Sequence, residues 1–120
     1  MEGVVLLFVV ILTLSPPSGT ATFYRDGLME KVAEYRGYRG PRTPVAALSC
    51  ADLGRDGWLL VAGEWLEVRV VDCSAAHDFE RNRAKGLVAE LPWAVWEELG
   101  LPLAPVPALL EWEPPRHEFN

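Results

Sequence analysis

The chain has little positive charge. Its 120 residues include 11 Lys and Arg against 17 Asp and Glu, which gives a net charge of −6. A surface that binds nucleic acid needs clustered Lys and Arg to contact the phosphates, so this composition argues against a nucleic-acid partner. A sugar polymer is not excluded, because proteins bind sugars mainly by aromatic stacking and hydrogen bonds. The length allows one domain, and the sequence contains no internal repeat and no low-complexity segment.

The chain has few long stretches free of glycine and proline, since ten of each are spread along it and residues 64–85 are the one extended exception. This spacing indicates short elements and disfavours a helical bundle. Apolar, β-branched and aromatic runs predict six strands, at residues 20–25, 45–48, 58–61, 65–71, 87–91 and 105–112. The prolines in the last run predict an edge strand. Because no strands alternate with helices at βαβ spacing, we expect a mainly β fold, a small closed or nearly closed barrel.

Two short helices are expected beside these strands. In the first, Leu28, Val32 and Tyr35 recur at helical spacing between charged residues, and Gly37 ends the helix. The second begins at Pro92 and stops at Gly100. The polar stretch 74–85 between the fourth and fifth strands is predicted to be a loop.

The N-terminus predicts export. An apolar run of 11 residues, Val4 to Leu14, is too short to span a bilayer comfortably, and helix breakers and small residues follow it. We therefore expect residues 1–21 to be a signal peptide, cleaved near Ala21, with an uncleaved short anchor as the alternative. The product would be secreted or lie in the periplasm or cell envelope, without a stable membrane span. Residues 114–120 are expected to form a disordered tail.

The chain has only two cysteines, Cys50 and Cys73. In an oxidising compartment they are the only possible intrachain pair, and the chain-entropy treatment assigns such a bridge about 3 kcal/mol of stability. The alternative is a zinc site, but two Cys and two distant His lack the ligand spacing of known zinc sites. A structural disulfide is therefore favoured, and no metal or other cofactor is expected.

Two carboxylates end two neighbouring strands and form the only constellation that suggests chemistry. Asp72 ends the run Trp65–Val71, and Glu90 lies in the run 87–91. Strict alternation places Asp72 on the side of Leu66, Val68 and Val70, which is the expected core side, at the mouth of the barrel. The other interpretation is structural: both acids accept backbone N–H groups or cap turns at strand ends.

Three segments together resemble the double-psi β-barrel proteins related to rare lipoprotein A and to the expansin/barwin group. TATFYR resembles the first strand of that family, VRVVDCSAAHDF its strand ending in Asp, and GLVAELPWAVWEELGL its Gly-x-Val-x-Asp-Leu-Ser segment with the following helix. The resemblance covers residues 20 to 113. It implies a six-stranded double-psi β-barrel, with residues 22–113 as the domain, and a groove for a glycan. One departure is that Leu48 follows Ala46-Ala47 where members of the lipoprotein A type have His.

The resemblance implies a wall-directed function in one of two forms. The first is lytic transglycosylase activity on peptidoglycan strands, in which Asp72 is the general acid/base and Glu90 is its charge neighbour. The second is an expansin-like module that binds wall glycan without cleaving it, so the sequence leaves open whether the protein is an enzyme. Tyr24 is a candidate stacking platform for a sugar, and His77 a candidate groove residue or proton carrier. We expect a monomer whose partner is cell-wall polysaccharide.

Overall fold

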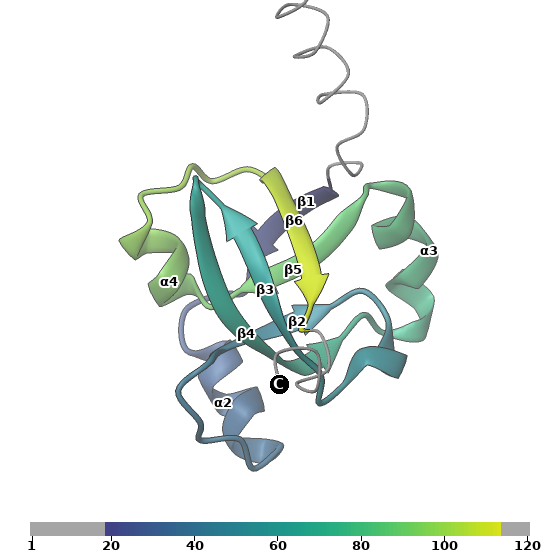
Figure 1. The fold of residues 1–120 in the computed structure, drawn as a ribbon. Helices are drawn as coiled ribbons and strands as arrows, with labels where there is room; N and C mark the ends of the chain where they lie inside the picture. Colours follow the sequence, from purple (N-terminus) through teal and green to yellow (C-terminus); the bar gives the residue numbers. More distant parts are fainter. Residues whose placement is uncertain (1–18, 114–120) are drawn as a thin grey trace, which may run out of the picture.

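The structure is a computed structural model in which residues 19–113 are described. The predicted tail at 114–120 lies outside the described residues, as does most of the predicted signal peptide, residues 1–18. The described part is mainly β, with six strands in one closed barrel in the order β1-β5-β2-β4-β3-β6 (Figure 1). The strands are β1 Gly19–Phe23, β2 Thr43–Ala47, β3 Asp56–Val61, β4 Glu64–Cys73, β5 Leu87–Leu91 and β6 Val106–Trp112.

The strand order alternates between the two halves of the chain. Each of β1, β2 and β3 has both of its neighbours among β4, β5 and β6. If β1, β2 and β3 are exchanged with β4, β5 and β6, respectively, the order of strands around the barrel and the pairing directions stay the same. β1·β5 and β2·β4 are parallel, and the other four pairs are antiparallel. The barrel therefore has an internal pseudo-two-fold arrangement that strand-by-strand prediction from the sequence did not indicate.

Closure of the barrel corrects the prediction for the last strand. β6 pairs with β1 on one side and with β3 on the other, so it is not an edge strand. The register with β3 runs from Ala108 to Trp112, and Pro107 therefore lies just before it. A proline at this position removes no donor from the β3 ladder, which is how the strand tolerates it.

β3 and β4 form a hairpin, and its turn consists of Ala62 and Gly63. Both have positive φ, 53° for Ala62 and 77° for Gly63, as the common two-residue hairpin turn requires. The barrel interior is filled by alternate residues of the strands, which together with Trp96 of helix α4 (Trp93–Glu98) form one apolar cluster. Its fully buried members include Ala21, Val45, Leu59, Val68, Val70, Ala89, Leu91 and Trp96.

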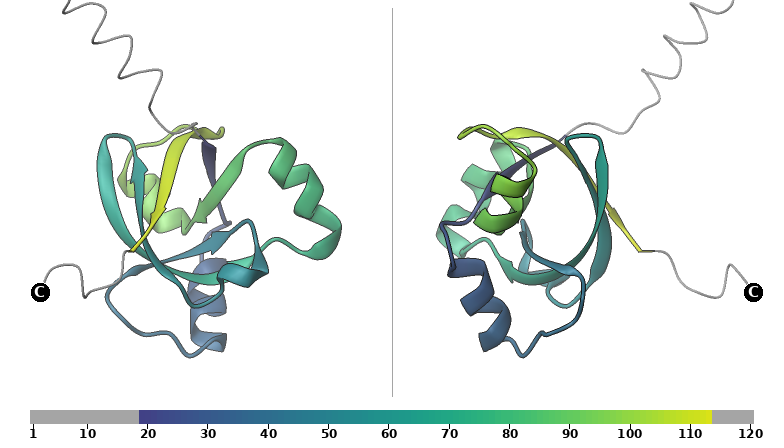
Figure 2. Two further views of the ribbon diagram at one scale, coloured as in Figure 1. Left: turned by 45° about the vertical axis from the view of Figure 1, so that its right-hand side comes forward. Right: turned by 90° about the vertical axis from the view of Figure 1, so that its left-hand side faces the viewer.

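Within residues 19–113, three α-helices lie outside the ring of strands, one more than predicted for this part of the chain (Figure 2). They are α2 Leu28–Tyr35, α3 Ala76–Ala84 and α4 Trp93–Glu98, and a 3-10 turn, η1 Cys50–Asp52, precedes β3. In α4, Trp96 is fully buried, packs against Phe23 with ring centroids 5.1 Å apart and donates from Nε1 to the Pro102 carbonyl at 2.9 Å. None of the helices in residues 19–113 is long and apolar enough to cross a membrane.

The buried side of α2 differs from the prediction. Met29 and Ala33 are buried against the outside of β2 and β4, whereas Tyr35 is 83% exposed. At 3.6 residues per turn, Tyr35 lies about 140° around the helix from the midpoint of Met29 and Ala33, so its side chain points away from the barrel. Ala33 was overlooked because a small residue adds little to an apolar pattern, although its size allows the helix to approach the barrel closely.

The polar stretch predicted as a loop contains α3. The helix has no buried residue, and two ion pairs at i,i+3 spacing run along it, Asp78 with Arg81 and Glu80 with Arg83. Such pairs stabilise a helix without an apolar stripe, which is why apolar periodicity missed it. Asn82 donates a 2.9 Å hydrogen bond to the Ser74 hydroxyl and so holds α3 to the end of β4.

The predicted disulfide is confirmed. Cys50 and Cys73 are bonded, with their Cα atoms 5.0 Å apart. The bridge joins the start of η1 to the last residue of β4, directly after Asp72. It therefore fixes the strand end that carries one of the two candidate acids.

Candidate functional site

Four residues on adjacent strands form a continuous row across one side of the barrel. Thr22 of β1 is paired with Glu90 of β5, Glu90 with Ala46 of β2, and Ala46 with Asp72 of β4. Ala46 thus separates the two acids, whose Cα atoms lie about 10 Å apart at ordinary strand spacing. The structure brings Asp72 and Glu90 onto one surface from positions 18 residues apart in the sequence.

This row faces outward, which corrects the predicted orientation of Asp72. Between β2 and β4 the register shifts: Val45 is paired with Val70, but Ala46 is paired with Asp72, so Val71 is an extra residue. A bulge of this kind reverses the alternation beyond it. Val71 and Ala46 both pack in a second apolar cluster outside the barrel, beneath α2, and Asp72 lies beside them.

Asp72 is held by two side chains. The Tyr24 hydroxyl donates to Oδ2 at 2.6 Å, and the Arg36 guanidinium lies 4.0 Å from Oδ1. Arg36 also donates from Nε to the Val71 carbonyl at 3.1 Å, which ties the C-terminal end of α2 to the bulge. The Asp72 side chain is 25% exposed, so water still reaches it.

Tyr24, the predicted stacking platform, is half-buried and packs against the second cluster. Burial raises the pKa of its hydroxyl, and the hydrogen bond to Asp72 and the charges of Asp72 and Glu90 raise it further. The hydroxyl is therefore a permanent donor to Asp72 at any physiological pH. In this arrangement Tyr24 positions an acid, while its ring forms part of the packing under α2.

Glu90 differs from Asp72 in its surroundings. Burial raises the pKa of its carboxyl above the ordinary value, the Thr22 hydroxyl opposes this by donating to Oε2 at 3.1 Å, and the charges of Asp72 and Asp78 raise it again. The side chain borders a groove of about 300 Å³ between the outside of β1 and β5 and the end of α3. The groove is lined by Thr20, Thr22, Asn82, Lys85, Leu87, Glu90 and Pro105.

The family resemblance implies a groove for a glycan, but the sequence does not predict the position of this groove, because its far wall belongs to α3. The sequence predicts a loop at Asn82 and Lys85, and it predicts Thr22 only as part of a strand. The composition of β1 and β5 does contain the signal: Thr20, Thr22 and Glu90 are the polar residues of these two strands, and all three line the groove. The parallel pairing of β1 with β5 is what brings these residues together, since it places Thr22 opposite Glu90.

His77 does not join the two acids through any hydrogen bond or ion pair. Its side chain is 83% exposed near the start of α3, and Nε2 lies 3.3 Å from Asp78. Within residues 19–113, no group of three or more His, Cys, Asp or Glu side chains is arranged to hold a metal ion.

Comparison with known proteins adds no relative. No protein-family model, curated protein or solved structure matches the chain. The fold and the site define the class that the structure supports: a six-stranded, mixed, closed β-barrel with a disulfide at one strand end and two outward-facing carboxyl groups on one row.

Proposed function

We propose that this protein is an exported barrel of the double-psi type, related to rare lipoprotein A and expansins, that acts on cell-wall glycan as a lytic transglycosylase. The observation that carries the proposal is the position of Glu90: a carboxyl group with a raised pKa, beside a groove of about 300 Å³ that is rich in hydrogen-bonding groups. The alternating strand order with two parallel pairs supports the double-psi assignment.

Glu90, rather than Asp72, is the general acid in this proposal. A general acid must hold its proton near neutral pH, and burial of Glu90 acts in that direction. Asp72 instead has one oxygen bonded to Tyr24 and the other facing Arg36, and it does not border the groove. Asp72 then acts through its negative charge, which contributes to the raised pKa of Glu90.

The reaction follows from one acid and the substrate's own hydroxyl. Protonated Glu90 gives its proton to the glycosidic oxygen while the bond between that oxygen and C1 breaks. A hydroxyl of the same sugar attacks C1 and closes an anhydro ring, and its proton returns to the Glu90 carboxylate. The Thr20 and Thr22 hydroxyls, the Asn82 amide and the Lys85 ammonium are available to bind sugar hydroxyls along the groove.

The second candidate function is a module that binds wall glycan without cleaving it. Two observations favour it: Leu48 replaces the histidine that the family resemblance leads one to expect, and Asp72 is engaged by Tyr24 and Arg36. In this case the groove beside Glu90 is a binding site only, and its polar side chains hold the polymer.

Incubation of the purified protein with peptidoglycan sacculi, followed by mass spectrometry of the soluble products, tests both candidates. Lytic activity yields anhydro-muropeptides, which Glu90→Gln abolishes, whereas Glu98→Gln on the exposed side of α4 does not. Product formation by Glu90→Gln would show that the acid is misassigned. Sedimentation of the protein with sacculi in the absence of any product supports the binding module, and absence of both product and binding contradicts both candidates.

A further inference from the structure

A second surface, separate from the groove, lies on the outer faces of β4, β3 and β6. The register of these strands places one outward residue of each side by side, in rows that cross the three strands. In the order β4–β3–β6, the first two rows are Trp65–Leu60–Leu109 and Glu67–Trp58–Glu111. We call these six residues the tryptophan face.

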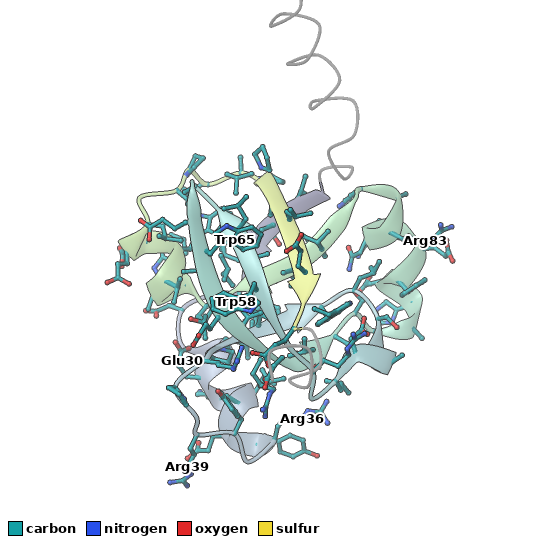
Figure 3. The ribbon with its side chains drawn as sticks, viewed as in Figure 1. Glu30, Arg36, Arg39, Trp58, Trp65 and Arg83 are labelled. Atoms are coloured by element: carbon teal, nitrogen blue, oxygen red, sulfur yellow. A yellow bond between two sulfur atoms is a disulfide. The ribbon has the colours of Figure 1, made fainter. Side chains whose placement is uncertain are left out.

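No element of the described residues covers the tryptophan face. Trp65 is 46% exposed, Glu67 and Glu111 are exposed, and the other three side chains are half-buried. In the view of Figure 1, β4, β3 and β6 face the reader and none of the helices lies in front of them. Figure 3 shows Trp65 and Trp58 one above the other on this side of the molecule.

The charges of this face are not balanced. In the neighbouring row, which contains Asp56 and Arg69, the charges are balanced. Asp56 forms an ion pair with Arg69 and another with Arg42 at 3.6 Å. Glu67 and Glu111 flank Trp58 from the two adjacent strands, and neither makes an ion pair with any residue between 19 and 113. The face therefore presents an indole ring between two carboxylates without an ion-pair partner, with an apolar row beside it. The charge of Arg42 acts on Glu67 from a greater distance, so Glu111 is the less compensated of the two.

The backbone of this surface is already paired. β3 is bonded to β4 and β6, β4 also to β2, and β6 also to β1. A partner therefore cannot add a strand here, and it must bind through side chains alone. Its side chains must include a cation for the second row and an apolar group for the first.

We propose that the tryptophan face docks a basic amphipathic helix of a partner protein. A Lys or Arg side chain lies over the Trp58 ring, where the ring face and the carboxylates of Glu67 and Glu111 attract it. An apolar side chain one helical turn away packs on Trp65 and its row. The geometry fits, because rows two residues apart along a strand are separated by about 7 Å and one turn of four helical residues rises about 6 Å.

A protein helix fits this face better than a polymer of amino sugars. An amino sugar also carries an ammonium group, and its ring can stack on Trp65. Leu60 and Leu109, however, complete the first row with aliphatic side chains, which favour an apolar side chain over a hydroxylated ring. The proposal is independent of the glycan function, since no residue of the tryptophan face borders the groove beside Glu90.

The test uses the full chain and an 18-residue synthetic helix with Lys and Leu spaced by four residues on one face. In NMR titrations, the indole N–H signals of Trp58 and Trp65 shift saturably, whereas that of buried Trp96 does not. A scrambled peptide of identical composition, which has no amphipathic face, produces no saturable shift. Chitosan oligosaccharides are titrated in the same way, to test whether the face binds an amino-sugar polymer instead of a helix.

Two double variants separate a specific contact from general charge attraction. Glu67→Gln with Glu111→Gln weakens peptide binding by about tenfold, the effect expected for two surface ion pairs and a cation–π contact. Glu97→Gln with Glu98→Gln removes the same charge from α4 and leaves binding within about twofold of the wild type.

Several results would overturn the proposal. Absence of saturable shifts at millimolar peptide would show that the face docks no such helix. If both double variants weakened peptide binding equally, the binding would depend on the net charge of the protein and not on the tryptophan face. Tighter binding of chitosan oligosaccharides than of the peptide would identify a glycan surface, and self-association that shifts Trp58 and Trp65 would identify a second copy as the occupant.

Discussion

The Tyr24 hydroxyl donates to the Asp72 carboxylate at 2.6 Å, across 48 residues of sequence. The bond joins the segment after β1 to the end of β4, and α2 covers the cluster beside it. It also separates the roles of the two acids, because it engages Asp72 and leaves Glu90 beside the groove.

Tyr24→Phe removes this hydrogen bond and keeps the ring. We expect the free energy of unfolding to fall by about 1.5 kcal/mol, the lower end for a bond to a charged acceptor, because water partly replaces the donor at Asp72. Urea denaturation followed by circular dichroism measures the change. Tyr35→Phe, at a side chain that is 83% exposed, is the control and should alter stability by less than about 0.5 kcal/mol. Equal effects of the two variants would contradict the role assigned to Tyr24.

Glu90 makes stability depend on pH. Its pKa is raised in the folded state, so the folded protein favours the protonated carboxyl, and this stability is lost as the pH rises through the folded-state pKa. Glu90→Gln, which cannot ionise, should therefore be stabilised relative to the wild type at neutral pH. The advantage should shrink as the pH falls toward the unfolded-state pKa of about 4.3. Urea denaturation of both proteins at a series of pH values measures the difference.

Thr22→Val tests the direction in which the Thr22 hydroxyl shifts the pKa of Glu90. The Thr22 hydroxyl lowers the pKa of Glu90 by donating to its carboxylate, and valine has the same shape without the donor. The Glu90 titration, followed by NMR of its side-chain carbon, should move to higher pH in this variant. A midpoint that stays fixed or falls would show that the hydrogen bond does not form in solution.

Reduction of the Cys50–Cys73 bridge should cost about 3 kcal/mol of stability, as expected for a loop of this length. Urea denaturation with and without dithiothreitol measures the loss. The double variant Cys50→Ala/Cys73→Ala is the control, because its stability should equal that of the reduced protein and should not respond to dithiothreitol. A wild type that is insensitive to the reductant, with the bridge verified as broken, would contradict the prediction.

The residue at which the folded chain starts determines whether β1 can pair with β6. All pairing between β1 and β6 is made by Gly19, Thr20 and Ala21, and Ala21 is fully buried. A chain that starts at Thr22, as cleavage after Ala21 would produce, loses this entire seam. We expect its thermal midpoint to lie at least about 5 °C below that of a chain that starts at Gly19. Equal midpoints would show that the seam contributes little.

Local patterns predicted the strands well where each strand obeys its own alternation. The fifth strand was predicted from Leu87 to Leu91, as observed. The predicted ends of the fourth strand and of the helix after Pro92 lie within two residues of the observed ends. The disulfide was predicted because only one pair was possible. These features depend on neighbouring residues in the sequence, which is why the sequence alone reveals them.

The errors arise where a distant strand sets the outcome. Asp72 turned outward because pairing with β2 requires Val71 as a bulge, and no residue of β4 signals that by itself. The prolines of β6 favoured an edge position, but a proline does not indicate whether the sheet closes into a barrel. The groove beside Glu90 needs both the parallel pairing of β1 with β5 and a polar helix, and neither is visible in apolar periodicity.

The alternating strand order has a consequence for folding. Since no two strands of the same half are neighbours, neither half can form a hydrogen-bonded sheet alone. The barrel must therefore form and unfold as one cooperative unit, with long-range pairings made late and at high entropic cost. Cutting the chain in the Ala62–Gly63 turn would give two fragments that acquire structure only together, each serving as the template for the other.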